Sequence, residues 1–203
     1  MLSKIDIELA RKRIIGYLNQ TPLLTSSTLN KVCGANLYFK CENFQKSGSF
    51  KYRGVANALL SLSEEERQKG VITHSSGNHG AALAAFSKKL GLHCAVVVPQ
   101  SASKFKLNAI ERYGAHIFKC GSSLESRELA VRELMESKDM TYIPPYDHPD
   151  VISGQGTLGL EVMEELTAVE ELWLPVGGGG LASGNVLSSG DSSQVVGAEP
   201  VLA

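Results

Sequence analysis

Four consecutive glycines, residues 177–180, follow the apolar run LWLPV, which is typical of a buried strand. Glycines between the carboxyl end of a strand and the start of a helix expose backbone N–H groups where the helix dipole is positive. This arrangement suits a phosphate group. A flexible turn is the alternative, but four glycines lose much backbone entropy on folding, so a plain turn would hardly need them. The run predicts a phosphate site.

A second polar turn, residues 75–80 (SSGNHG), lies between the β-prone run 71–73 and an apolar segment that begins at Ala81. Its backbone amides suit a carboxylate, and its side chains offer a hydroxyl, an amide and an imidazole. Taken alone, the segment is equally compatible with a simple helix-capping turn. His74 and His79 lack the HExxH spacing of a zinc-binding helix, so no metal site is predicted here.

Lys51 follows the segment SGSF and falls in the first turn of a helix predicted from Phe50 to about Leu62, with Ser49 as its cap. The helix N-terminus carries partial positive charge, which disfavours the ammonium form and lowers the pKa of the amine. Schiff-base chemistry requires a lysine with a lowered pKa. The alternative is a lysine that bends into solvent, which is the commoner case for an isolated lysine.

Residues 154–159 (GQGTLG) match the G-x-G-x-x-G fingerprint of dinucleotide-binding folds. The context is poor, because residues 150–153 form only a weak strand and no strand ending in an acidic residue follows at the expected distance. A nicotinamide-binding protein is therefore a disfavoured alternative.

Strands and helices alternate through short glycine turns along most of the chain. Helices are predicted over residues 4–19, 50–62, 81–90, 101–113, 124–137 and 157–166, and strands over 37–41, 71–73, 94–98, 116–119, 141–143, 172–176 and 195–197. This order predicts an α/β fold with parallel strands and crossover helices. Residues 181–193 stand where a crossover helix is expected, although serine and glycine are poor helix formers.

Composition excludes several classes of protein. The 203 residues are 43% hydrophobic and 20% charged, with a net charge of -1, so a globular protein of one large or two small domains is expected. The charge gives no reason to expect nucleic acid or an anionic membrane as partner. No apolar stretch approaches the ~20 residues of a membrane span, and no signal-peptide core is present. The cysteines form no CxxC pair, which favours reduced thiols in a cytoplasmic protein.

No single motif identifies a family, but the whole set, in this order along the chain, resembles a known one. From about Thr21 to Pro200 the chain resembles the fold-type II pyridoxal-phosphate enzymes, most closely the serine racemases and the serine/threonine dehydratases. The supporting segments are TPLLTSSTLN, FKCENFQKSGSFKYRG, THSSGNHG, VVVPQ, RYGA, ESRE, VISGQGT, PVGGGG and GAEP.

The resemblance implies a fold like that of the tryptophan synthase β subunit, with helices on both faces of parallel or mixed sheets. It implies a small domain over residues 53–146 and a large cofactor domain from residues 1–52 and 147–203. Because family members continue further, the large domain is expected to be incomplete, with an open sheet edge and exposed core. The segment 185–193 departs from the family and is shorter than expected.

The resemblance also assigns roles to residues. Lys51 carries pyridoxal phosphate, and Ser76 faces the substrate from the opposite side as a second acid/base, which favours racemisation with dehydration as a side reaction. The other cofactor-binding residues implied are Asn78, Tyr146, Gly177, Gly178, Gly179 and Gly180. The substrate-binding residues implied are Ser75, Ser76, Gly77, Asn78, His79 and Arg127.

Ligands other than the cofactor and substrate follow from the same resemblance. The positions implied for a nucleotide triphosphate activator such as ATP are Ser26, Ser27, Thr28, Lys46, Ser47 and Tyr113. Glu199 is implied as an oxygen ligand for Mg²⁺ or Ca²⁺. Each position also has an ordinary structural explanation, such as a helix cap or an exposed side chain.

Two classes of function are therefore carried forward. The first is an amino-acid racemase and dehydratase acting on L-serine, with L-threonine as a further substrate, and a homodimer by family. The second is a catalytically inactive truncated product that binds a partner or a subunit of a longer protein. A cysteine-synthase-like enzyme that replaces a β-substituent is weaker, because its asparagine loop usually differs from SSGNHG.

Overall fold

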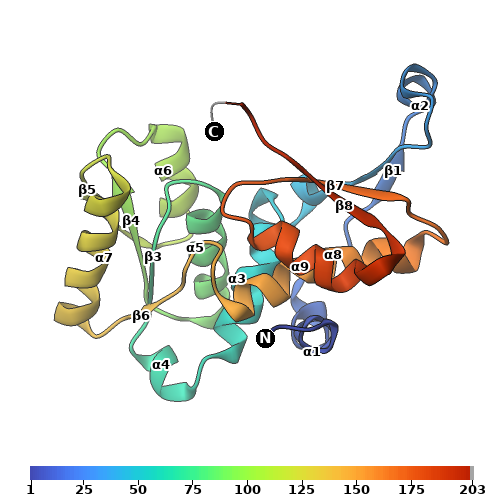
Figure 1. Ribbon diagram of the computed structural model, residues 1–203. Helices are drawn as coiled ribbons and strands as arrows, with labels where there is room; N and C mark the ends of the chain where they lie inside the picture. Colours follow the sequence, from blue (N-terminus) through green and yellow to red (C-terminus); the bar gives the residue numbers. More distant parts are fainter. Residues whose placement is uncertain (202–203) are drawn as a thin grey trace.

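The computed structural model describes residues 1–201, and its strands and helices alternate as expected for an α/β fold (Figure 1). The larger sheet has four parallel strands in the order β5-β4-β3-β6. Its elements are β3 (Val71–His74), α5 (Asn78–Leu90), β4 (Cys94–Pro99), α6 (Lys104–Glu111), β5 (His116–Cys120), α7 (Leu124–Lys138) and β6 (Thr141–Tyr142).

Helices cover both faces of this sheet. Val96 and Val98 of β4 pack on one face in a cluster that includes α5 and α6, while Ala95 and Val97 pack on the other face against Val131 of α7. This double burial explains why β4 is a continuous apolar run instead of an alternating one, and why all four residues of β3 are buried.

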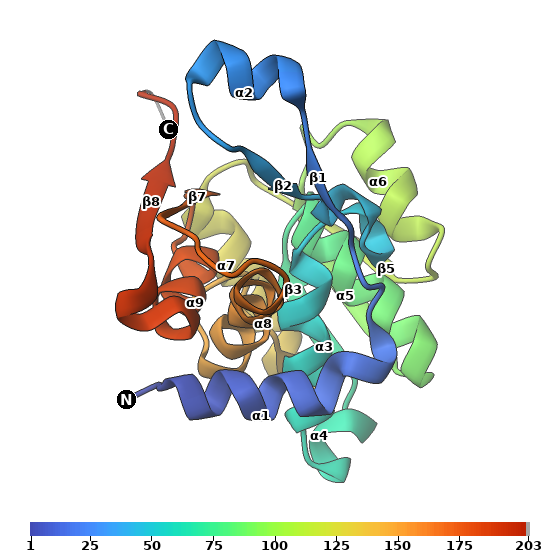
Figure 2. The ribbon, with the colours of Figure 1, turned by 90° about the vertical axis from the view of Figure 1, so that its right-hand side faces the viewer.

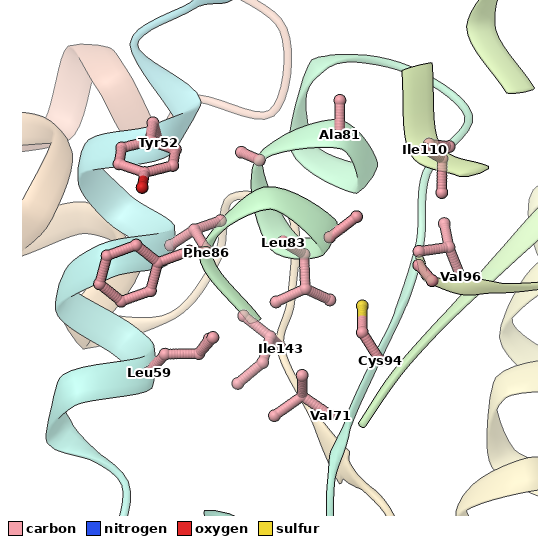
Figure 3. Close-up of a cluster of buried hydrophobic side chains, with 14 of the residues drawn as sticks. Tyr52, Leu59, Val71, Ala81, Leu83, Phe86, Cys94, Val96, Ile110 and Ile143 are labelled. Carbon is pink, nitrogen blue, oxygen red and sulfur yellow. The ribbon is translucent and has the colours of Figure 1, made fainter. Parts of the chain in front are cut away.

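The largest core cluster joins the sheet to the helix α3 (Lys51–Ser61), as Figure 3 shows. Phe86 of α5 stacks edge-to-face on Tyr52 of α3, with ring centroids 5.3 Å apart, and on Tyr17 at 5.5 Å. This packing fixes α3, and therefore the start of that helix at Lys51, against the sheet.

The remaining elements come from both ends of the chain. They are α1 (Lys4–Ile14), β1 (Leu23–Thr25), α2 (Ser27–Cys33), β2 (Tyr38–Lys40), α4 (Glu64–Gln68), α8 (Pro149–Glu165), β7 (Glu171–Pro175), α9 (Gly180–Ser189) and β8 (Gln194–Ala198). Strands β1 and β2 pair antiparallel, and β7 and β8 pair parallel. In Figures 1 and 2, α2 projects at the end of the β1–β2 pair.

The fingerprint GQGTLG lies in the middle of α8, not in a turn between a strand and a helix. A Cβ atom on Gly154 would stand 2.6 Å from the backbone oxygen of Arg53 in α3, and one on Gly156 would stand 2.6 Å from the oxygen of Gly184 in α9. These glycines therefore let three helices approach closely. The weak strand predicted over 150–153 is wrong, and the dinucleotide alternative loses its structural context.

The serine- and glycine-rich segment after the four glycines does form a helix, α9, which ends in a short 3-10 turn at Gly190–Ser192. Its low intrinsic propensity is offset by packing on α8 and by side chains that bond within the helix. The hydroxyls of Ser188 and Ser189 both donate to the backbone oxygen of Asn185, at 3.1 and 2.8 Å. Tertiary contacts thus override local propensity here.

Several predicted boundaries are corrected. The helix predicted over residues 4–19 ends at Ile14 and gives way to a 3-10 turn, since Gly16 follows. Ser49 does not cap α3: Phe50 holds that position, and the Ser49 hydroxyl has no partner among the described residues. Helix α6 is preceded by Ser103, not Ser101.

Helices α5 and α8 begin earlier than predicted, at Asn78 and Pro149 instead of Ala81 and Thr157.

All four cysteines are free thiols. No helix within residues 1–201 is long and apolar enough to cross a membrane.

Candidate functional site

Residues 143–146, in the linker between β6 and α8, meet all three segments in which chemistry was predicted. The Lys51 amine donates a hydrogen bond of 2.7 Å to the backbone oxygen of Pro145. The His79 ring lies 3.2 Å from the backbone oxygen of Ile143. The ring of Tyr146 lies against Gly178 of the glycine run. One short linker therefore brings the lysine, the SSGNHG turn and the four glycines to a common site.

Lys51 lies in the first turn of α3, as predicted, where it is the first helical residue, and its side chain is half-buried. Burial lowers the pKa of its amine to about 8. The pKa is lowered, as predicted, but the cause is loss of water around the ammonium group and not the helix dipole. About a tenth of the amine is therefore unprotonated at pH 7, far more than for an ordinary lysine, and the unprotonated form is the nucleophile for a carbonyl group.

The four glycines form an open cradle at the start of α9. Gly179 caps the helix in the left-handed conformation, with φ of 81°. A Cβ on Gly177 or Gly179 would meet nothing within 4 Å, whereas a Cβ on Gly178 would stand 2.1 Å from the Tyr146 ring. The backbone is therefore open at residues 177 and 179, whereas Tyr146 lies against residues 178 and 180. These features fit a phosphate group.

The SSGNHG turn runs from the end of β3 into the first turn of α5, with Gly77 in the capping position. The Ser75 hydroxyl accepts a hydrogen bond of 3.3 Å from the Gly77 backbone N–H. Gly80 is required here, because a Cβ atom would stand 2.1 Å from the Ser75 backbone oxygen. Ser76 is half-buried and Asn78 is exposed, so both remain available to a ligand.

His79 plays a different part from its neighbours in the turn. Its side chain is 2% exposed, and burial, followed by the charge of Lys51, lowers the pKa of the ring to about 3. The ring is therefore neutral at pH 7 and donates through Nε2 to the Ile143 carbonyl. Its Nδ1 has no hydrogen-bond partner within residues 1–201. The imidazole thus holds the SSGNHG turn against the linker between β6 and α8.

Arg127 lies in the first turn of α7, half-buried, with its Nε donating to the Ser123 backbone oxygen at 3.3 Å. Burial, and then the charge of Arg127, lowers the pKa of His74, the residue that precedes Ser75. Arg127 is therefore close enough to act electrostatically at the base of the SSGNHG turn.

The residues predicted to bind a nucleotide lie on separate parts of this chain. Ser27 and Thr28 are exposed on the projecting helix α2, which Figures 1 and 2 place away from α6 and the adjoining Tyr113. Ser26 caps α2, and the Lys46 amine donates to the Tyr17 backbone oxygen at 2.5 Å.

Ser47 and Glu199 complete the predicted ligand positions. Ser47 adopts a positive φ of 63°, and its hydroxyl is buried without a partner among the described residues. Glu199 is exposed beyond β8, and residues 1–201 contain no cluster of three acidic, histidine or cysteine side chains that would hold a metal ion with it.

Two features of the site were missed from the sequence. The carbonyl oxygens of Ile143 and Pro145 are backbone groups, so no side-chain motif marks them; the only local signal is the rigid Pro144-Pro145 pair. Arg53, two residues after Lys51, is completely buried in an ionic cluster with Glu42 and Glu161. The available signal was a second charged residue on a helix whose other residues are mostly apolar or small.

Comparison with known proteins gives consistent matches. A serine racemase from Dictyostelium discoideum is 50% identical over 199 residues, which cover 97% of this chain and 61% of that protein. The L-threo-3-hydroxyaspartate ammonia-lyase of Saccharomyces cerevisiae is 46% identical over 198 residues, covering 96% of this chain and 61% of that protein. The chain thus spans about 61% of the length of these curated relatives.

Solved structures agree in fold. The crystal structure of the Dictyostelium discoideum serine racemase superposes with a TM-score of 0.94 at 49% identity, covering all of this chain and 67% of that one. A threonine deaminase isoform from Solanum lycopersicum gives a TM-score of 0.90 at 34% identity, covering 97% and 58%. The pyridoxal-phosphate dependent enzyme family matches residues 14–203. With that match and the geometry of Lys51 and the glycine cradle, the chain belongs to the pyridoxal-phosphate dependent enzyme family.

Proposed function

We propose that this protein is a pyridoxal-phosphate-dependent serine racemase that also dehydrates L-serine and L-threonine. The observation that carries the proposal is the placement of the Lys51 amine, with its lowered pKa, beside the linker that also meets the glycine cradle and the SSGNHG turn. Relatives at 40–50% identity that are named serine racemase support the substrate class.

The protein's share of the chemistry follows from these positions. The N–H groups at the start of α9 bind the phosphate, and Lys51 attaches the cofactor through its amine. When bound, pyridoxal phosphate supplies an electron sink for the charge left on the substrate α-carbon. Asn78 orients the cofactor ring, with Tyr146 beside it, and the N–H groups of residues 75–79 bind the substrate carboxylate, with Arg127 near the entrance.

Racemisation requires a proton donor and acceptor on each face of the substrate. In this proposal Lys51 Nζ takes or returns the α-proton on one face, and Ser76 Oγ does so on the other. Alternatively, once the α-proton has been removed, the hydroxyl leaves from the adjacent β-carbon as water, and hydrolysis of the released enamine yields pyruvate and ammonia from serine. The match to an ammonia-lyase at 46% identity supports this second outcome.

The test measures both products from L-serine in the same reaction: D-serine by chiral chromatography and pyruvate by a coupled assay. Ser76→Ala is expected to lower D-serine formation at least tenfold, about 1.4 kcal/mol in barrier, with cofactor binding retained. Dehydration is expected to fall less, because it needs only the Lys51 face. Equal D-serine formation by Ser76→Ala and wild type would contradict the assignment of Ser76.

The same proposal includes the domain division, oligomeric state, location and activators of the protein. They are a small domain over residues 53–146, a large domain from residues 1–52 and 147–203, a homodimer, a cytoplasmic location, and activation by ATP and by Mg²⁺ or Ca²⁺ through Glu199. A second candidate is a non-catalytic product that binds a partner. Trp173 favours it, since this residue of the two-stranded β7–β8 sheet is 64% exposed.

A further inference from the structure

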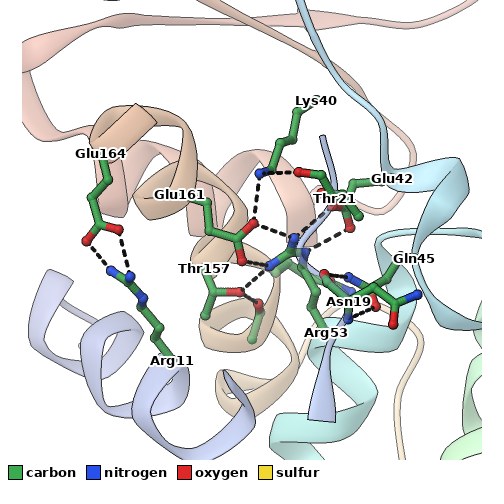
Figure 4. Close-up of polar contacts among 12 residues, drawn as sticks. Arg11, Asn19, Thr21, Lys40, Glu42, Gln45, Arg53, Thr157, Glu161 and Glu164 are labelled. Carbon is green, nitrogen blue, oxygen red and sulfur yellow. Dashed lines mark hydrogen bonds and ion pairs between the residues drawn. The ribbon is translucent and has the colours of Figure 1, made fainter. Parts of the chain in front are cut away.

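Arg53 lies on α3 two residues after Lys51, and its side chain is 0% exposed (Figure 4). Its Nε and Nη2 donate to the two carboxylate oxygens of Glu42, at 2.8 and 2.7 Å. Its Nη1 and Nη2 donate to the two oxygens of Glu161 on α8, at 2.6 and 2.9 Å. Nη1 also donates to the Thr157 hydroxyl at 3.3 Å. All five guanidinium N–H groups therefore have an acceptor.

Such a cluster does more than stabilise the fold. A buried ion pair gains little net free energy over a well-packed apolar group, because desolvation offsets the attraction. Its geometry, however, is specific, since two carboxylates must meet one planar guanidinium. Lys40 extends the cluster, because its amine lies 2.9 Å from Glu161 and 2.8 Å from Glu165. Positional accuracy is thus the property that this arrangement supplies.

The Glu42–Arg53 pair closes the loop that ends in Lys51. Within that loop, Ser47 and Gly48 have positive φ angles of 63° and 81°. The positive φ of Ser47 is unfavourable for a side-chain-bearing residue, so the loop needs contacts that hold it. Gln45 adds a second anchor, because its side chain bonds the Asn19 backbone through both N–H and carbonyl groups, at 3.0 and 2.9 Å.

The Glu161 side of Arg53 joins α3 to α8, whose preceding linker contains Pro145. Close packing continues along the same interface, where a Cβ on Gly54 would stand 2.8 Å from the backbone oxygen of Val151. The separation between Lys51 Nζ and Pro145 O depends on how α3 is set against α8 and its linker. Arg53 is the charged group that joins the two helices within one turn of the lysine, beside the hydrogen bond of 3.2 Å from the Gly54 N–H to the Gln155 side chain.

We propose that Arg53 is the positioning residue for Lys51: by joining Glu42 to Glu161, it closes the loop before the lysine and holds the amine against Pro145. This inference rests on the proposed role of Lys51 as the cofactor lysine. Without the bonds from Arg53 to Glu42 and Glu161, the loop before Lys51 opens and water reaches the Lys51 amine. The Lys51 side chain then no longer has a fixed orientation in the site.

The first measurement uses the apo chain, so that it does not depend on cofactor chemistry. The rate of reductive methylation of Lys51 by formaldehyde is followed against pH by mass spectrometry. Wild type is expected to show a midpoint near the pKa of about 8. Arg53→Lys keeps the positive charge but lacks the planar guanidinium group that bonds both carboxylates. It is expected to move this midpoint upward by about one pH unit, because the Lys51 amine becomes more hydrated. Arg53→Met is expected to move it further.

The second measurement is the affinity for pyridoxal phosphate by absorption titration. Arg53→Met is expected to lose at least tenfold and Arg53→Lys less. The matched control is Arg11→Ala, which removes a bidentate pair to Glu164, also on α8 but exposed. It is expected to leave both the midpoint and the affinity unchanged.

If the Arg53 variants fail to fold, Glu42→Gln is used in their place, because it keeps the shape of the Glu42 side chain but removes its charge. An upward shift in the midpoint supports the proposal. A folded Arg53→Lys or Glu42→Gln protein with the wild-type midpoint and affinity overturns it. These outcomes are distinct from a failure of the proposed function, in which wild type itself binds no cofactor through Lys51.

Discussion

The aromatic ring of Tyr146 packs directly on the backbone of Gly178, so closely that a Cβ atom there would stand 2.1 Å from the ring. This contact joins the linker that receives the Lys51 hydrogen bond to the cradle proposed for the phosphate. The absence of a side chain at residue 178 is therefore required by a neighbour, whereas at residue 177 the space is open.

Gly178→Ala is expected to weaken the binding of pyridoxal phosphate by at least tenfold, because the new methyl group displaces the Tyr146 ring or the cradle itself. Gly16→Ala adds the same methyl group outside the site, where nothing lies within 4 Å, and is the matched control. Absorption titration of both variants measures the difference. Equal affinities for the two would show that the Tyr146 contact has no part in shaping the site.

Cofactor attachment is expected to depend on pH through Lys51. Because burial lowers the pKa of the amine to about 8, the reactive unprotonated fraction rises about tenfold per pH unit below that value and levels off above it. The rate of attachment, followed by stopped-flow absorption from pH 6 to 10, measures this profile. A rate still rising steeply toward pH 10.5, the ordinary lysine value, would place the amine in solvent.

His79 is expected to make stability fall in mild acid. Its folded-state pKa of about 3 lies below the ordinary value of 6.5, so between these values the unfolded chain binds a proton that the folded chain does not. The contribution is complete above pH 6.5 and is lost as pH falls toward 3, by up to about 1.4 kcal/mol per pH unit. Urea unfolding from pH 7 to 4 should show a smaller slope for His79→Gln than for wild type.

The glycines of α8 are expected to be sensitive to a single methyl group. Gly156→Ala should lower the free energy of unfolding by about 1–3 kcal/mol, because its Cβ would meet the backbone of Gly184 on α9. Gly16→Ala, where nothing lies within 4 Å, should change it by less than about 1 kcal/mol. Thermal unfolding of both variants checks this, and similar losses at the two positions would contradict close helix approach as the role of Gly156.

The parallel sheet and the positions of the three motifs were predictable, because buried strands and glycine turns have local signals. The first half of α8 was not: Val151 and Ile152 are β-branched and suggested a strand, whereas Pro149 at the first helical position marks the true start. Helix α9 was doubtful because its serines and glycines gain their stability from α8, which no local window contains. The same holds for Lys51 and Pro145, which lie 94 positions apart.

The most direct test of the central claim is the visible absorption of the purified chain after addition of pyridoxal phosphate, compared with Lys51→Ala and with Lys104→Ala, a lysine outside the site. The account predicts a band in wild type and Lys104→Ala that shifts when L-serine is added, and no band in Lys51→Ala. Sodium borohydride should then fix the cofactor to Lys51 alone, as read by peptide mass spectrometry. A band of wild-type intensity in Lys51→Ala, or a cofactor fixed to another lysine, would contradict the account.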